Sequence, residues 1–244
     1  MDESAIRNVL DDLFGRELLD ASPGEWGIAD HCASPSALGF CTTITPETIR
    51  TAIDKRVDVV VTHHDAWDFM YEQREDVHAL LREEALCHIW AHRPLDAADF
   101  GPAAALLAGI GAAPTATMDS IAGSIGDLPE ATCYAEVRNS ISAFLGEQPR
   151  AESVPRREAI GRIAFVPGAG IYTGYMKEML PHGIDLYITG ETNMYLMEYA
   201  RYHGVGVLIY THNYTELPGV QAFAKRIARS LHLDVLGHLG DSHF

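Results

Sequence analysis

The hydrophobic residues of this chain recur with two different periods. Over residues 3–19 the apolar positions lie three or four residues apart, which predicts an amphipathic helix that ends before the turn residues Pro23 and Gly24. Short, continuous apolar runs then alternate with further helical patterns, and such runs are typical of buried strands in parallel sheets. The strands predicted in this way cover residues 36–44, 57–64, 86–96, 162–170, 184–191 and 205–213.

Helical patterns lie between these predicted strands. The segment 45–56 begins with Thr45 and Pro46, which favour the N-cap and the first position of a helix. Its strand–helix–strand context is typical of a right-handed crossover, so we expect parallel strands. Other helices are predicted over residues 70–85, 99–112, 171–180, 192–204 and 217–233. This alternation predicts an α/β fold, and a less regular stretch places a lobe boundary near Ala122.

Composition narrows the class of protein. The 244 residues include 18 Lys and Arg against 34 Asp and Glu, a formal charge of −16, which disfavours nucleic acid as a partner. The longest apolar stretch, residues 103–113, is well below the ~20 residues that cross a bilayer, so no membrane span is expected. No C-x-x-C pair or secretory leader is seen, and we therefore expect a cytoplasmic protein with reduced thiols. The cysteines are Cys32, Cys41, Cys87 and Cys133.

Metal-binding residue types follow several of the predicted strands. In open α/β sheets, ligands gather just beyond the carboxyl ends of the strands, so residues far apart in sequence meet there. Both imidazoles of an adjacent histidine pair reach one pocket only if the chain turns at the strand end. The residues in such positions are His63, His64, His92, Asp96, Glu191, His212 and Glu216.

Five of these residues form a plausible ligand set for metal. Asp96 has two oxygens with which to bridge a pair of cations, and His212 and Glu216 share one face if the turn after their strand is helical. Together with His63 and His64 they suit a dinuclear site for Zn, Fe, Mn or Co. Glu191 is the candidate general base, or the residue that orients a ligand.

Each residue also has an ordinary structural interpretation. A histidine pair is more often a surface or hydrogen-bonded feature than a metal site, and Asp96 is equally suited to cap the following helix. Residues 211–216 contain capping types, and the "VPGAG" segment at residues 166–170 reads as a tight turn as well as a phosphate-binding one. The last residues, "GHLGDSHF", are interpreted as a frayed tail rather than as a cap on the pocket.

Four motifs, in their order and spacing, resemble one known family. The segments "VVVTHH", "AHRPLDAA", "DLYITGE" and "THNYTE", with the opening "IRNVLDDLF" and the later "SISAFLGEQPR", are similar to those of the Nif-three-like family (NGG-one-interacting factor three). Members of this family are dinuclear-metal proteins, and some carry the name GTP cyclohydrolase I type 2. The resemblance places metal ligands on His63, His64, Asp96, His212 and Glu216.

The resemblance also implies an architecture. It implies a two-lobed α/β fold with mixed sheets flanked by helices, assembled as a toroidal hexamer of two stacked trimers. The expected parts are an N-terminal lobe over 1–121, a middle lobe over 122–204 and a segment, 205–244, that returns to the N-terminal lobe. Asp65, Arg93 and Pro94 depart from the residues that members usually carry there.

Two functions are therefore considered. A pair of divalent ions activates water, which predicts a metal-dependent hydrolase acting on a nucleotide-like, phosphoester or cyclic amide substrate, with GTP cyclohydrolase type 2 chemistry as one form. The alternative is a metal-binding scaffold, metallochaperone or regulatory protein without turnover. An open coordination position and substrate-reading groups favour the hydrolase, and a closed site favours the alternative.

Overall fold

The computed structural model describes residues 3–30, 32–118 and 122–241. These residues form two mixed sheets flanked by helices, which confirms the predicted fold class. The chain divides into two compact units, here called unit 1 (Met1–Gly101 and Gly219–Ser242) and unit 2 (chiefly Pro102–Pro218). The division into lobes at 121/122 and 204/205 stays a prediction, and residues 119–121 lie outside the described part.

Unit 1 contains a five-stranded sheet in the order β1-β4-β3-β2-β11. The pairs β4–β3, β3–β2 and β2–β11 are parallel, whereas β1 pairs with β4 in antiparallel fashion. The predicted parallel crossover is therefore confirmed. The bounds of these strands are β1 Trp26–Ala29, β2 Ala37–Phe40, β3 Val59–Thr62, β4 Cys87–Ala91 and β11 Asp234–His238.

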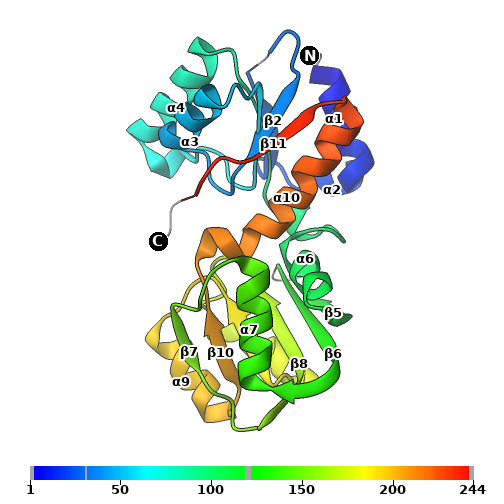
Figure 1. Ribbon diagram of the computed structural model, residues 1–244, viewed down its shortest axis with the longest axis vertical. Helices are drawn as coiled ribbons and strands as arrows, with labels where there is room; N and C mark the ends of the chain where they lie inside the picture. The colour runs from blue at the N-terminus through cyan, green and yellow to red at the C-terminus, as the bar shows by residue number, and fades with distance from the viewer. Residues whose placement is uncertain (1–2, 31, 119–121, 242–244) are drawn as a thin grey trace. The chain divides into compact units, whose positions relative to one another are not determined.

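Helices flank this sheet. Figure 1 shows α3 and α4 on one side of the β2 and β11 strands and α1, α2 and the end of α10 on the other. The capping box at Thr45 and Thr48, with Pro46 at the first position, begins α3 as the sequence predicts. The helices are α1 Glu3–Phe14, α2 Arg16–Asp20, α3 Pro46–Asp54, η1 Asp68–Met70, α4 Glu72–Glu83 and α5 Arg93–Asp96.

Two predicted boundaries in unit 1 are wrong. The single helix expected over residues 3–19 is broken at Gly15, which takes a φ of +78° that favours glycine and ends the first helix. The chain end is not a frayed tail up to Asp241, because β11 joins the sheet and the Asp241 side chain is fully buried. His243 lies outside the described residues.

Unit 2 contains a six-stranded sheet in the order β5-β6-β8-β9-β10-β7. Its centre, β8–β9–β10, is parallel, and the outer pairs are antiparallel. The parallel core corresponds to the predicted alternation of strands and helices in this part of the sequence. The strands are β5 Ala113–Met118, β6 Gly123–Cys133, β7 Ala151–Ser153, β8 Ala159–Val166, β9 Leu186–Thr189 and β10 Gly206–Ile209.

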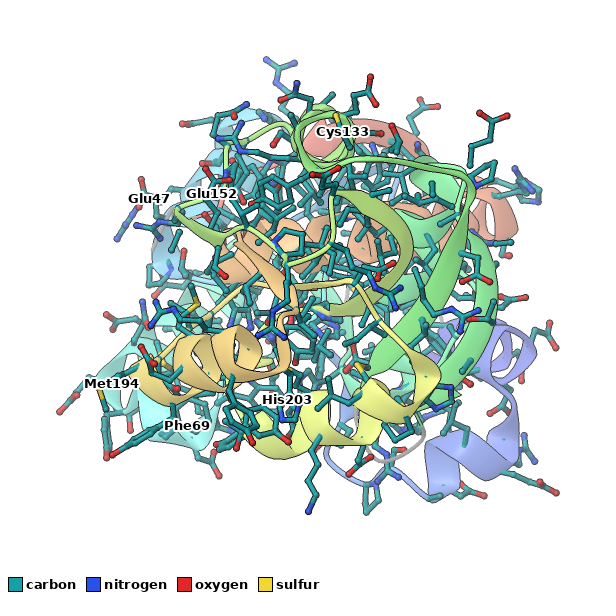
Figure 2. The ribbon with its side chains drawn as sticks, turned by 90° about the horizontal axis from the view of Figure 1, so that it is seen from below. Glu47, Phe69, Cys133, Glu152, Met194 and His203 are labelled. Atoms are coloured by element: carbon teal, nitrogen blue, oxygen red, sulfur yellow. The ribbon has the colours of Figure 1, made fainter. Side chains whose placement is uncertain are left out.

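Helices cover both faces of the second sheet. On β8, Ile163 and Phe165 pack with residues of α6 and α7, whereas Ala164 and Val166 pack with residues of α8 and α9. This alternation is the period of two that a strand imposes. Figure 2 shows α9 from outside, with Met194 near one end and His203 near the other. The helices are α6 Pro102–Gly109, α7 Tyr134–Leu145, α8 Thr173–Met179, η2 Leu180–His182 and α9 Met194–His203.

The last helix begins earlier than its sequence pattern predicts. Helix α10 covers His212–Leu231 and contains Pro218, so it starts five residues before the predicted start at residue 217. Residues 212–216 are mostly polar, so the apolar pattern did not include this first turn of the helix. Among the described residues, no helix combines the length and the apolar character that a membrane crossing requires.

Candidate metal centre

His63 and His64 stand together at the end of β3. All four residues of this strand are buried. Both histidines donate their backbone N–H to the carbonyl of Thr42, so the chain has turned at this point and their rings lie on the same side, with centroids 4.8 Å apart. The turn expected from the sequence is therefore present.

His92 completes a cluster of three imidazoles in unit 1. It follows β4, and its ring centroid lies 4.8 Å from that of His63 and 5.4 Å from that of His64. The three residues each offer one ligand atom, and these atoms lie within 4.8 Å of one another. The sequence showed His92 as a strand-end residue, but its pattern did not place it among the ligands.

One hydrogen bond shows which ring nitrogen of His63 carries the proton in the neutral ring. Its Nδ1 lies 3.0 Å from the carbonyl oxygen of Ala91, which only accepts, so Nδ1 carries the proton in the neutral ring. The lone pair is then on Nε2, which lies 3.4 Å from Oδ1 of Asp96. A buried ring nitrogen and a carboxylate oxygen facing each other at this distance match the donor chemistry of a borderline divalent cation.

His92 has the same arrangement with a different partner. Its Nδ1 lies 2.6 Å from Oε2 of Glu25, and an ionised carboxylate only accepts, so Nδ1 donates. Nε2 is then the nitrogen suited to metal. A carboxylate bound to the far nitrogen of a histidine is a recurrent support of metal ligands. The sequence pattern did not indicate Glu25, because this residue lies in the turn before β1 and does not follow a predicted strand.

A second group of candidate ligands lies in unit 2, in the first turns of α10. His212 and Glu216 share one face of the helix, with Nε2 and Oε1 3.2 Å apart. Glu191, which follows β9, accepts from Nδ1 of His212 at 2.5 Å. Burial lowers the pKa of His212, but Glu216 and then Glu191 outweigh it through hydrogen bonds and charge and raise this pKa to about 9.

The "VPGAG" turn lies against this second group. Gly168 has a φ of +61°, and a Cβ at this position would be 2.2 Å from Oε1 of Glu216 and 2.9 Å from Nε2 of His212. Its N–H donates to Thr215, three residues after His212. The glycine is therefore required both by its backbone conformation and by the close approach of the two candidate ligands.

Asp65, one of the departures from the family pattern, faces a different histidine. Its Oδ1 lies 3.8 Å from Nδ1 of His88, whose side chain is fully buried. Burial, followed by His78, lowers the pKa of His88 to about 3, and burial raises the pKa of Asp65. Nε2 of His88 bonds to Thr62, so this ring presents the opposite nitrogen from the candidate ligands.

Comparisons with known proteins agree with this architecture. The chain is 28% identical over 202 residues to a Neisseria meningitidis protein named GTP cyclohydrolase 1 type 2 homolog, covering 79% of each chain. It is 27% identical over 209 residues to the Archaeoglobus fulgidus protein of that name, covering 82% of each. These identities are low, and the names describe those proteins.

Solved structures show the same fold. A Thermus thermophilus protein superposes with a TM-score of 0.84 at 19% identity over all of both chains. Reduced HcgD from Methanocaldococcus jannaschii gives 0.79 at 19% identity over 97% of each. The Duf34/NIF3 (NGG1p interacting factor 3) family matches residues 7–237. The chain with these strand-end histidines and carboxylates therefore belongs to the Duf34/NIF3 family.

Proposed function

We propose that this chain binds two divalent metal ions and is a metal-dependent hydrolase. The proposed ligands are His63, His64, Asp96, His212 and Glu216, and the proposed ions are Zn, Fe, Mn or Co. His92 joins the ligand set, because it belongs to the same imidazole cluster as His63 and His64.

One observation carries the proposal. Each of the four histidines has Nδ1 in a hydrogen bond, which leaves Nε2 as the nitrogen that we propose for metal binding in every ring. In a set of merely structural histidines, no such uniform choice of nitrogen is expected. The partners of Nδ1 are Ala91 for His63, Thr43 for His64, Glu25 for His92 and Glu191 for His212.

The donor set fits divalent ions of intermediate softness. Imidazole nitrogens dominate in unit 1, and the carboxylates of Asp96 and Glu216 add negative charge that a divalent cation neutralises. Ions bound by such groups lower the pKa of water and polarise a substrate oxygen. Glu25 and Glu191 orient His92 and His212, and Glu191, whose side chain is 42% exposed, is the proposed general base.

The proposed substrate is a small molecule with a flat ring, of the nucleotide or cyclic amide kind. Two relatives carry the name GTP cyclohydrolase 1 type 2 homolog. In unit 1 the Trp67 ring meets His92 edge-on, with centroids 5.6 Å apart, and lies nearly parallel to the ring of Phe69, which is 65% exposed. Aromatic faces of this kind stack with heterocycles.

Assembly and location complete the proposal. We propose, by resemblance to the family, a homo-oligomer in the form of a toroidal hexamer, and, from the cysteine pattern, a cytoplasmic location. The formal charge of −16 argues against nucleic acid as a partner.

Metal analysis tests the ligand assignment. Untagged protein is purified as wild type, as His64→Ala with Asp96→Ala, and as His212→Ala with Glu216→Ala, and its metal content per chain is measured. We expect about two equivalents in the wild type and a large loss in both double variants, because each removes a nitrogen and a carboxylate. The matched control is His203→Ala with Glu198→Ala, both exposed on α9, which should keep the wild-type content.

The same preparations test turnover. Wild type loaded with metal is assayed against GTP, other nucleotides and simple phosphoesters, and the loss of hydrolysis should follow the loss of metal. Wild type that binds no added metal contradicts the ligand assignment. Wild type that binds two ions without hydrolysing any of these compounds contradicts the hydrolase and favours the scaffold or metallochaperone.

A further inference from the structure

The chain end binds the loop that follows β2. The carboxylate of Asp241 accepts the backbone N–H of Thr42 at 2.9 Å and that of Thr43 at 3.1 Å. Its side chain is fully buried and also bonds to Nε2 of His238 at 2.8 Å. A buried carboxylate with several N–H partners holds a loop in one conformation, since its removal leaves those donors buried without acceptors.

This loop meets the candidate ligands through the carbonyl of Thr42, which accepts the backbone N–H of His63 and of His64, and through the hydroxyl of Thr43. Oγ1 of Thr43 lies 2.9 Å from Nδ1 of His64, and the two residues also form an isolated parallel bridge. When Nδ1 of His64 donates to this hydroxyl, the lone pair is on Nε2, and the bond orients the ring so that Nε2 can bind a metal. A continuous chain of hydrogen bonds therefore links Asp241 to Thr43 and Thr43 to His64, all within unit 1.

We propose that Asp241 is a positioning residue for the metal ligand His64. It acts through Thr43, by fixing the backbone from which the Thr43 hydroxyl meets the imidazole. This role rests on the proposed function, in which His64 binds metal. It assigns a purpose to the C-terminal segment, whose last described residue is Asp241.

Asp58, the residue before β3, binds the other end of β2 and provides a control. Oδ2 of Asp58 accepts the backbone N–H of Ser36 at 2.7 Å and that of Ala37 at 2.9 Å, where β2 begins. Asp58 therefore accepts backbone N–H groups at the start of β2, as Asp241 does after its end, in a more exposed setting. The hydrogen bonds of the Asp58 side chain go to Ser36 and Ala37 rather than toward a candidate ligand, so its removal separates loss of structure from loss of metal binding.

The test measures the dissociation constant for Zn²⁺ by competition with a chelating dye, together with the melting temperature of the metal-free protein. Asp241→Ala and Thr43→Val should each weaken Zn²⁺ binding by about tenfold or more, as loss of outer partners of metal ligands does. Asp241→Asn keeps one acceptor oxygen for both N–H groups and should restore most of the affinity. Asp58→Ala should lower the melting temperature and leave the Zn²⁺ constant unchanged.

A double variant adds a second check. Because Asp241 is proposed to act through Thr43, Asp241→Ala combined with Thr43→Val should weaken Zn²⁺ binding about as much as the stronger single variant. Wild-type affinity in Asp241→Ala, or equal losses in Asp58→Ala and Asp241→Ala, overturns the positioning role alone. A wild type that binds no Zn²⁺ overturns both this role and the proposed function.

Discussion

The two groups of candidate ligands differ in how their histidines are held. In unit 1, Nδ1 of His63 bonds to a carbonyl and Nδ1 of His64 to a hydroxyl, whereas Nδ1 of His92 bonds to a carboxylate. In unit 2, His212 lies between two carboxylates, which raise its pKa to about 9 despite burial. The histidines of both groups therefore have Nδ1 in a hydrogen bond, but those of unit 1 lie mainly among other imidazoles and that of unit 2 lies between carboxylates.

Burial lowers the pKa of both His88 and His212, and hydrogen-bonded carboxylates decide whether that lowering is reversed. His88 in unit 1 is fully buried and has a pKa of about 3, because burial dominates and the Asp65 carboxylate, at 3.8 Å, is beyond hydrogen-bond distance. His212 is also largely enclosed, yet its pKa lies above the ordinary value because Glu216 and Glu191 accept from it.

The largest effect is expected from Gly168→Ala. The new Cβ would be 2.2 Å from Oε1 of Glu216, so the carboxylate must move, and the positive φ adds strain. We expect Zn²⁺ affinity to fall by about a hundredfold, the upper range for disturbed ligand support. Gly183→Ala is the control, since it has a φ of +74° with no atom within 4 Å of a Cβ. Equal Zn²⁺ constants in the two variants would contradict the packing argument.

The next effect concerns the pH dependence of the metal-free protein. The folded-state pKa of His212 is raised, so its contribution to stability is present below the unfolded value of about 6.5 and is lost as pH rises through about 9. Glu216→Gln should reduce this loss, which for a shift from 6.5 to about 9 is about 3 kcal/mol. Urea unfolding at several pH values measures it, with the exposed Glu198→Gln as control. An unchanged slope in Glu216→Gln would show that Glu216 does not hold the proton on His212.

The smallest effect is expected at His88. Oγ1 of Thr62 donates to the carbonyl of His64 at 2.7 Å, so Nε2 of His88 must donate to Thr62. His88→Leu removes this donor and should lower the free energy of unfolding by about 1–3 kcal/mol, with a severalfold weaker Zn²⁺ constant. His88→Gln places an amide N–H near the position of Nε2 and should recover much of the stability. Equal losses in both variants would count against the assigned proton.

The candidate site was predictable from the sequence where strand ends carry it. His63 and His64 follow a continuous apolar strand, and Glu191 and His212 follow strands of unit 2. Because the ends of parallel neighbouring strands lie at one edge of a sheet, the side chains at those ends were expected to lie near one another. Glu25 could not be found in this way, because it bonds to His92 across 67 positions and lies in a turn. The role of Asp241 was missed for the same reason, since it meets Thr42 across 199 positions.

Local sequence patterns were enough to predict the α/β alternation, the parallel crossover of unit 1, the family and the strand-end positions of the candidate ligands. These properties depend on local periodicity and on short motifs, which neighbouring residues carry. The contacts of the folded chain were needed to identify the hydrogen-bonded nitrogen of each histidine and the close approach that requires glycine at position 168. They were also needed to connect the C-terminal segment with His64. Those properties depend on atoms that folding brings together from distant positions, and no local pattern records such contacts.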